Sequence, residues 1–262
     1  MKPPLTYYGG KQMLSKLIIS LIPTHHIYCE PFFGGGAIFF TKEPSKIEVI
    51  NDTNGELINF YRVIKTKFKK LEKEIKSTLH SREYHQAAKT VLGYPQLFDE
   101  VKRAWAIWTL ANQSYASKLD GSWGRDKKEN RSVKQLKTKR NSFTNEYTER
   151  LEQVQIENRD ALNIINIWDN KDTFFYLDPP YFNSNQGHYK GYTKEEFEKL
   201  LILLTGIKGK FLLSSYPSEL LDKYVKQNKW ITKKVDVPLS ISSNPSIKIK
   251  RKIEVLTANY KL

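Results

Sequence analysis

The spacing of apolar residues divides this chain into short apolar runs, typical of strands, and longer amphipathic stretches, typical of helices. Helical spacing covers residues 12–21 and resumes after Thr193, where Glu196 completes a capping box. We predict strands over residues 26–30, 47–52, 173–178, 209–216, 231–237 and 252–258, and a strand with its turn over residues 155–161. Strands that alternate with helices predict an α/β fold built on a mostly parallel, seven-stranded sheet.

The fourth predicted strand ends abruptly. Residues 173–177 are aromatic, branched or apolar, and Asp178-Pro179-Pro180-Tyr181 follows them directly. Because prolines cannot donate an N–H to a sheet, this strand should stop at Asp178. Ligands of open α/β sheets bind at the carboxyl ends of strands. The tetrapeptide therefore predicts a functional site, although an ordinary strand-ending turn would also accommodate it.

From residue 56 to about residue 150 helical periodicity dominates, and basic residues are frequent. Residues 112–125 have no clean period and combine amides, hydroxyls, aromatics and cations. Such a mixture favours contacts with base edges and phosphates of nucleic acid, although basic residues often form only a solvated helical face. We predict an inserted, mainly helical domain over residues 56–150 and a second domain built from residues 1–55 and 151–262.

The amino-acid composition indicates which kind of partner the protein binds and in which compartment it works. The formal net charge is +15, which favours a polyanion, nucleic acid first and a membrane surface second. Cys29 is the one cysteine, so we expect no disulfides and a reducing compartment. No apolar run approaches the roughly 18 residues of a membrane span, no signal peptide begins the chain, and no Cys or His cluster has metal-ligand spacing. We therefore expect a soluble, intracellular protein that binds no metal.

The tetrapeptide suggests a specific chemistry. The carboxylate of Asp178 and the carbonyl of Pro179 would be two neighbouring acceptors, which suit an exocyclic amino group with two hydrogens. Tyr181 adds a flat face on which a planar ring can stack. Hydrogen bonds that hold both protons localise the lone pair of the nitrogen, which can then attack an electrophilic methyl group held in line.

Two glycine-rich stretches favour a cofactor site. Residues 9–11 (Gly-Gly-Lys), beside two tyrosines, suit a ligand that carries a carboxylate and a sulfonium, although a solvated loop would also explain this stretch taken alone. Residues 30–36 join a strand to a helix through glycines, a geometry that holds polar cofactors. Asp52 can accept both ribose hydroxyls of an adenosine. Alternatively, Asp52 or Asn54 caps the next helix, and the two roles are compatible. Phe39 occupies the third glycine position of the dinucleotide fingerprint, which argues against a nicotinamide site.

In this order, the motifs resemble those of the Dam-like DNA adenine N6-methyltransferases (D12 class, alpha group), and the resemblance covers essentially the whole chain. Residues 32–36 match the family's Phe-x-Gly-x-Gly, and residues 178–181 match its catalytic Asp-Pro-Pro-Tyr. Residues 7–11 match an aromatic-x-Gly-Gly-Lys, with Tyr7 where Trp is common. Residues 254–260 are similar to the family's last strand.

The resemblance implies a Rossmann-like methyltransferase dependent on S-adenosyl-L-methionine, with an inserted DNA-recognition domain. It implies cofactor binding by Tyr7, Lys11, Glu30, Pro31, Phe32, Gly34, Gly36, Asp52, Asp160 and Asp178. It assigns catalysis to Asp178, Pro179, Pro180 and Tyr181, with the adenine flipped out of the duplex onto Tyr181. Tyr115 matches a residue that inserts into the base stack, and the charges of Lys118, Arg125, Lys248 and Lys250 predict further DNA contacts.

We therefore expect methyl transfer to adenine N6 in double-stranded DNA, for restriction-modification or epigenetic marking. The expected protein is a cytoplasmic monomer or weak dimer of a bacterial, phage or archaeal cell, with a cognate restriction endonuclease as a candidate partner. Two alternatives stay open: an amino-methyltransferase acting on cytosine N4 or on RNA adenine, and a DNA-binding regulator without catalysis. A cytosine C5 enzyme would need a cysteine after proline, whereas Cys29 precedes Pro31.

Overall fold

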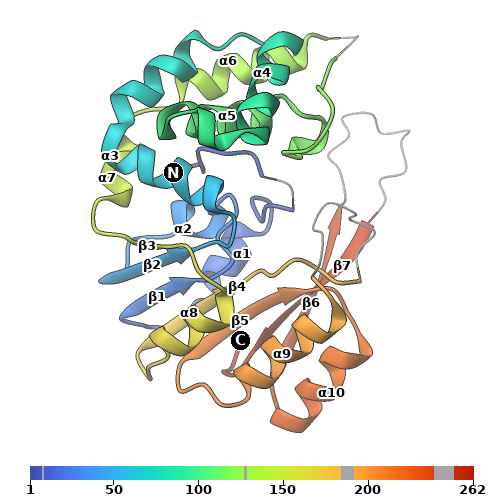
Figure 1. Cartoon of the computed structure of the whole chain (residues 1–262). Coiled ribbons are helices and arrows are strands. Elements are labelled where there is room, and N and C mark those ends of the chain that lie inside the picture. Colours follow the sequence, from blue (N-terminus) through green and yellow to red (C-terminus); the bar gives the residue numbers. More distant parts are fainter. Residues whose placement is uncertain (8, 127–128, 184–191, 239–250) are drawn as a thin grey trace. The chain divides into compact units, whose positions relative to one another are not determined.

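The computed structural model describes residues 1–7, 9–126, 129–183, 192–238 and 251–262. Its described residues form one seven-stranded sheet in the order β3-β2-β1-β4-β5-β7-β6 (Figure 1). The strands are β1 (Ile27–Glu30), β2 (Ile47–Asn51), β3 (Gln155–Glu157), β4 (Thr173–Leu177), β5 (Lys210–Ser215), β6 (Ile231–Pro238) and β7 (Arg251–Ala258). The pairs β1–β4, β2–β3 and β4–β5 are parallel, and β7 is antiparallel to β5 and β6. This confirms the predicted α/β fold.

β4 is fully buried because it lies between two parallel neighbours. All five of its residues are buried, as expected for an interior strand of a parallel sheet, which reads as a continuous apolar run. Phe175 is in register with Cys29 of β1 on one side and with Phe211 of β5 on the other. The strand ends at Leu177, so the two prolines stop it where the sequence predicted.

The chain divides into two compact units by its internal packing. Unit 1 comprises Met1–Ser20 and Phe33–Asp160, and unit 2 comprises Leu21–Phe32 and Ala161–Leu262. Strands β2 and β3 belong to unit 1, and the other five belong to unit 2. The predicted domain boundaries at residues 55 and 150 separate an expected catalytic domain from an expected recognition domain. They differ from the boundaries of these two packing units, and they stay a prediction.

Unit 1 is mainly helical. Its helices are α1 (Ser15–Ser20), α2 (Ala37–Thr41), α3 (Gly55–Ser77), α4 (Arg82–Gly93), α5 (Glu100–Gln113), α6 (Arg131–Asn141) and α7 (Glu146–Leu151). The helix α5 packs against both α3 and α4 (Figure 1) and buries Trp105 and Trp108. The helix predicted from residue 12 begins later, because Leu14 N–H donates to Lys11 O (3.0 Å) in a turn. α3 is kinked at Lys67, whose φ and ψ are −137° and 32°.

Unit 2 carries α8 (Ala161–Trp168), α9 (Lys194–Leu204) and α10 (Glu219–Asn228). The predicted capping box at the start of α9 is confirmed. Thr193 Oγ1 accepts from Glu196 N–H (3.2 Å), and Glu196 Oε2 accepts from Thr193 N–H (2.7 Å). The apolar face of α9 is buried, and α9 lies beside α10 (Figure 1).

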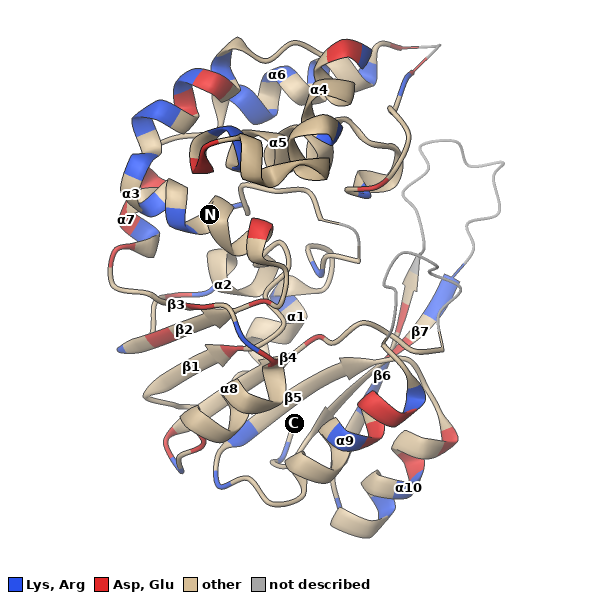
Figure 2. Ribbon diagram, viewed as in Figure 1, with Lys and Arg blue, Asp and Glu red and all other residues tan. Residues whose placement is uncertain are grey.

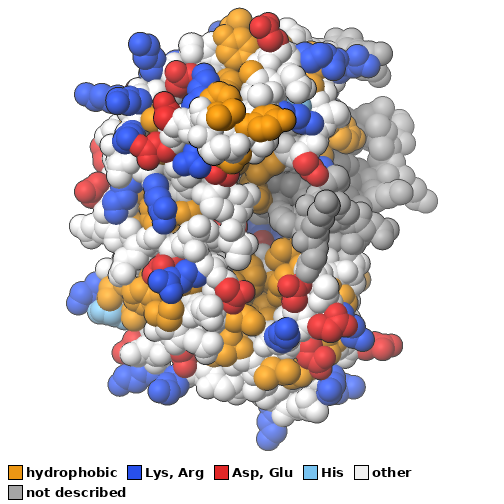
Figure 3. Space-filling view, in the orientation of Figure 1, with side chains coloured by type: hydrophobic (Ala, Val, Ile, Leu, Met, Phe, Trp, Pro, Cys, Tyr) orange, Lys and Arg blue, Asp and Glu red, His pale blue; other side chains and the backbone are white. Residues whose placement is uncertain are grey.

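Basic residues are most concentrated on α6, which carries five of them and no acid: Arg131, Lys134, Lys137, Lys139 and Arg140. Figure 2 shows these Lys and Arg positions in blue on α6, together with others along α3. Not all are available to a partner, since Arg140 donates to Thr78 O (3.0 Å) at the end of α3. On the face seen in Figure 3, basic and acidic side chains are interspersed.

Two classes of feature are missing from the described part of the chain. No helix there is both long enough and apolar enough to span a bilayer. Nor do three or more His, Cys, Asp or Glu side chains gather there in an arrangement suited to a metal ion.

Candidate active site

The glycine turn between β1 and α2 depends on residues without side chains. Gly34 and Gly36 have φ of +51° and +66°, the left-handed region that favours glycine. A Cβ on Gly36 would lie 2.6 Å from Phe33 Cζ, so alanine cannot fit without a shift of that ring. Phe33 N–H donates to Asn51 O (2.9 Å), which ties the turn to the end of β2. The turn is thus both shaped by glycine and anchored by the backbone.

Asp52, directly after β2, binds the same turn. Its Oδ2 accepts from Gly34 N–H (2.9 Å) and its Oδ1 accepts from Asn54 N–H (2.9 Å). Burial raises the pKa of Asp52, and these N–H donors oppose that rise. Each carboxylate oxygen has a further lone pair, so the carboxylate can still accept hydroxyl donors. The helix-opening role belongs to Asn54, whose side chain accepts from the N–H groups of Glu56 and Leu57.

The N-terminal motif packs on the glycine turn. A Cβ on Gly34 would lie 3.3 Å from Tyr7 Cδ1, and one on Gly35 would lie 2.7 Å from Tyr7 Cβ. Lys11 is buried, and its Nζ donates to Gly9 O (3.2 Å). Unit 1 therefore brings Tyr7, Gly34 and Asp52 together from three separate stretches of the sequence.

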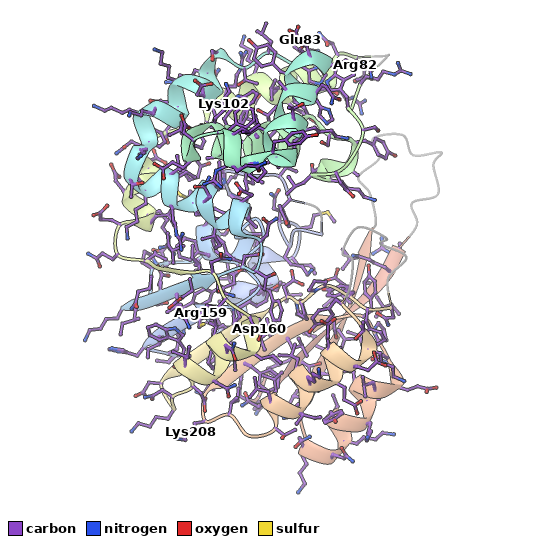
Figure 4. All side chains as sticks on the ribbon, in the orientation of Figure 1. Arg82, Glu83, Lys102, Arg159, Asp160 and Lys208 are labelled. Atoms are coloured by element: carbon purple, nitrogen blue, oxygen red, sulfur yellow. The ribbon has the colours of Figure 1, made fainter. Side chains whose placement is uncertain are left out.

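The loop that carries Asp160 is tied to the same end of β2. Asn51 exchanges two hydrogen bonds with the backbone of Arg159: Arg159 N–H donates to Asn51 Oδ1 (2.8 Å), and Asn51 Nδ2 donates to Arg159 O (3.0 Å). Asn158 Nδ2 also donates to the backbone carbonyl of Asp52 (2.7 Å). Asp160 is exposed beside Arg159, and Figure 4 labels both.

Tyr61 contacts the glycine turn, and no motif in the sequence predicts this contact. Its hydroxyl donates to Gly34 O (2.9 Å), and its ring meets Phe33 edge-on at 4.7 Å between centroids. The residue was assigned to the inserted helical domain. The signal that could have identified it is its helical spacing from Leu57 and Ile64, which places all three on the buried face of α3.

In unit 2, the end of β1 supplies three further predicted residues. Glu30 is 2% exposed, and its Oε2 accepts from the hydroxyl of Tyr28 (2.7 Å). Pro31 is buried, and Phe32 is half-buried with its ring edge-on to Tyr192 at 6.4 Å. A buried carboxylate with a hydroxyl donor is held in one orientation, which suits a binding role.

The tetrapeptide at residues 178–181, predicted to be catalytic, follows β4 and is internally bonded. The hydroxyl of Tyr181 donates to Asp178 Oδ1 (3.1 Å). Burial raises the pKa of Tyr181 well above its usual range, and the carboxylates of Asp178 and Glu254 raise it further, so Tyr181 stays a neutral donor. Its ring lies 4.5 Å from that of Tyr216, at an interplanar angle of 63°. The sequence predicted a stacking face for Tyr181, whereas the bond from its hydroxyl to Asp178 was not predicted.

The loop around Tyr115 is open and strained. Tyr115 is 71% exposed, while Ala116 and Ser117 adopt left-handed φ values of +54° and +56°. Hydrogen bonds close the loop below them: Tyr115 N–H donates to Ser122 O (2.8 Å), and Gly124 N–H donates to Gln113 O (2.7 Å). Lys118 is half-buried in this loop and Arg125, at its end, is exposed. Lys248 and Lys250 lie outside the described residues.

Comparison with known proteins agrees with the motifs. A family model described as D12 class N6 adenine-specific DNA methyltransferase matches residues 7–237. The type II methyltransferase M.MjaIII of Methanocaldococcus jannaschii is 27% identical over 221 residues, which cover 75% of each chain.

Two other relatives match over shorter segments. The type II methyltransferase M1.LlaDCHI of Lactococcus lactis subsp. cremoris is 47% identical over 66 residues, which are 25% of this chain and 23% of that protein. The DNA N-6-adenine-methyltransferase of Escherichia phage P1 is 32% identical over 111 residues, which are 39% of this chain and 14% of that protein. The chain thus spans less than a quarter of the length of these two relatives.

Proposed function

Because the chain belongs to the D12 class of N6 adenine-specific DNA methyltransferases, we propose that it methylates N6 of adenine in double-stranded DNA, using S-adenosyl-L-methionine. The observation that carries this proposal is the Asp178–Tyr181 hydrogen bond at the carboxyl end of an interior parallel strand. There a carboxylate acceptor and an aromatic ring are held in a fixed relation, which suits an amino group on a planar base.

The residues of unit 1 fit the proposed cofactor. Left-handed glycines at positions 34 and 36 let the backbone approach a ligand closely. The Asp52 carboxylate, oriented by two N–H donors, retains acceptor capacity for a ribose diol. Lys11 supplies a buried cation for a carboxylate. The full proposed binding set is Tyr7, Lys11, Glu30, Pro31, Phe32, Gly34, Gly36, Asp52, Asp160 and Asp178.

When bound, S-adenosylmethionine supplies an electrophilic methyl group on a sulfonium. The chain's own part is to hold the nucleophile. Asp178 and the carbonyl of Pro179 accept hydrogen bonds from the two N6–H groups, which localises the lone pair of the nitrogen. The nitrogen gains the methyl group as the sulfonium loses it, and it then releases one of its two protons to solvent. Pro180 fixes the backbone, and Tyr181 stacks on the flipped base. Since no side chain serves as a covalent nucleophile, the rate depends on positioning and electrostatics.

We assign DNA contact to the predicted recognition domain, residues 56–150. Tyr115 is exposed on a loop closed by hydrogen bonds, which supports its insertion into the base stack. Lys118 and Arg125 lie in or beside this loop and neutralise phosphates in the proposal, as do Lys248 and Lys250.

The test is a product assay with tritiated S-adenosylmethionine, using unmethylated plasmid DNA and an RNA of matched length. We expect label in DNA alone, and N6-methyldeoxyadenosine after digestion and mass spectrometry. Label in N4-methylcytosine or in RNA would replace the proposal with the corresponding amino-methyltransferase. Binding of DNA without any transfer would identify a regulator instead.

The compartment, the oligomeric state and the biological role are also proposals. We propose a cytoplasmic monomer or weak dimer in a bacterial, phage or archaeal cell, acting in restriction-modification or epigenetic marking. A cognate restriction endonuclease is the candidate partner. Light scattering of the purified chain tests the oligomeric state. Comparison of host DNA methylation with and without this protein tests the marking role.

A further inference from the structure

Three residues outside the catalytic tetrapeptide share one face of the sheet beside it. They are Tyr216, directly after β5, and Lys252 and Glu254 on β7. Ser214 is in register with Leu256, and side chains two residues apart on a strand point to the same face. Tyr216 and Glu254 are each two residues from that pair, toward the carboxyl end of β5. The antiparallel return of β7 therefore brings two charged side chains to the strand ends where Asp178 lies.

Direct contacts join these residues into one path. Lys252 Nζ lies 2.9 Å from Glu254 Oε1 and donates to the hydroxyl of Tyr216 at 3.0 Å. The ring of Tyr216 meets that of Tyr181 at 4.5 Å, and Tyr181 donates to Asp178 Oδ1 at 3.1 Å. The path thus runs from an ion pair on β7, with Glu254 buried and Lys252 half-buried, to the proposed catalytic carboxylate after β4, entirely within unit 2.

Stability is a poor explanation for this ion pair. The side chain of Glu254 is 3% exposed and that of Lys252 is 23% exposed. Removing two charges from water offsets most of their attraction, so buried pairs contribute little net stability. Burial alone would lower the pKa of Lys252, but Tyr216 and Glu254 outweigh it and raise that pKa. Lys252 therefore stays charged, and it adds no net charge beside Asp178 because Glu254 balances it.

We propose that Lys252 is a positioning residue for methyl transfer, and this inference rests on the proposed function. Held by Glu254, Lys252 fixes the hydroxyl of Tyr216. The Tyr216 ring then fixes the edge of Tyr181, so that the Tyr181 hydroxyl stays on Asp178. The site keeps the negative charge of Asp178, which favours the positive charge that the amine nitrogen gains as it accepts a methyl group.

The experiment measures the rate constant of a single turnover with saturating tritiated S-adenosylmethionine and unmethylated plasmid DNA. Tyr216→Phe removes only the hydroxyl that Lys252 binds, and Lys252→Met removes the cation. Each should lower the rate about 10- to 100-fold, with unchanged cofactor affinity by calorimetry. Lys252→Arg should restore most of the rate. The double variant should be no slower than Lys252→Met alone, because both changes break one path.

Asp236→Asn is the matched control. Asp236 forms an exposed ion pair with Arg251 (2.7 Å), and its register partner is Ile253, on the opposite face of β7 from Lys252 and Glu254. This variant should keep the wild-type rate. A folded Tyr216→Phe variant at the wild-type rate would overturn the inference, as would losses in the two single variants that simply add. A wild-type chain that methylates no adenine would overturn the proposed function itself, and the inference with it.

Discussion

The glycine turn at residues 34–36 and the loop around Tyr115 both use left-handed backbone, but with different residues. In the turn, glycine occupies the left-handed positions Gly34 and Gly36. In the loop, Ala116 and Ser117 adopt the same region, at a cost of about 1–2 kcal/mol each. The turn is enclosed, whereas the loop presents an exposed Tyr115. Glycine in the turn therefore allows close packing without backbone strain. In the loop, strained backbone at Ala116 and Ser117 accompanies an exposed Tyr115 side chain.

Replacing Gly36 tests the close fit, with the largest expected effect. Gly36→Ala should lower the free energy of unfolding by about 2–5 kcal/mol, from left-handed strain and from overlap with Phe33. It should also abolish cofactor binding in calorimetry. Gly93→Ala is the matched control, since a Cβ there meets nothing within 4 Å. Gly93 ends α4, so its substitution should be neutral or slightly stabilising. Equal effects of the two changes would show that the turn needs no glycine.

Replacing Tyr115 tests the exposed loop. Tyr115→Ala should weaken productive DNA binding by about 1–3 kcal/mol, the usual contribution of a ring stacked on bases. Thermal stability should not change, because the side chain is 71% exposed. Tyr94→Ala, which removes an aromatic that is 56% exposed elsewhere in unit 1, is the control for general surface effects. A loss of DNA binding in both variants, or in neither, would remove the special role of this loop.

The pH dependence of Asp52 tests how the turn is anchored, with the smallest expected effect. Burial raises the folded pKa of Asp52 above its ordinary value of 3.8. The folded state therefore holds the proton more tightly, and the contribution of Asp52 to stability falls as pH rises from about 3.8 through the folded pKa. Each unit of rise corresponds to about 1.4 kcal/mol. Urea unfolding measures the free energy of unfolding of the wild type and of Asp52→Asn at each pH. As pH rises, the wild type should lose stability relative to the variant. A difference independent of pH would contradict the raised pKa.

Local sequence patterns were enough to predict the ends of several secondary-structure elements. The aromatic run of β4 and its two prolines predicted where that strand ends, and the Thr193 capping box predicted the start of α9. Three of the motif glycines, Gly9, Gly34 and Gly36, also lie at left-handed positions. These features depend on residues adjacent in sequence, so the sequence alone contains them.

Contacts between distant segments were not predictable in the same way. The bond from Lys252 to Tyr216 depends on the register of β7 with β5, which no local pattern determines. The available signal was the pair of opposite charges, Lys252 and Glu254, two residues apart at the start of a strand that is mostly apolar from Val255 onward. Similarly, Tyr61 binds Gly34 because α3 packs back on the glycine turn, although its sequence position suggested the recognition domain.

The central claim is that Asp178, at the end of β4, holds the amine that receives the methyl group. A single-turnover assay of Asp178→Ala with unmethylated DNA, paired with a DNA-binding titration of the same variant, tests it most directly. We predict a rate at least about 100-fold below the wild type, with DNA affinity within about twofold. Near-normal turnover in that variant would contradict the claim.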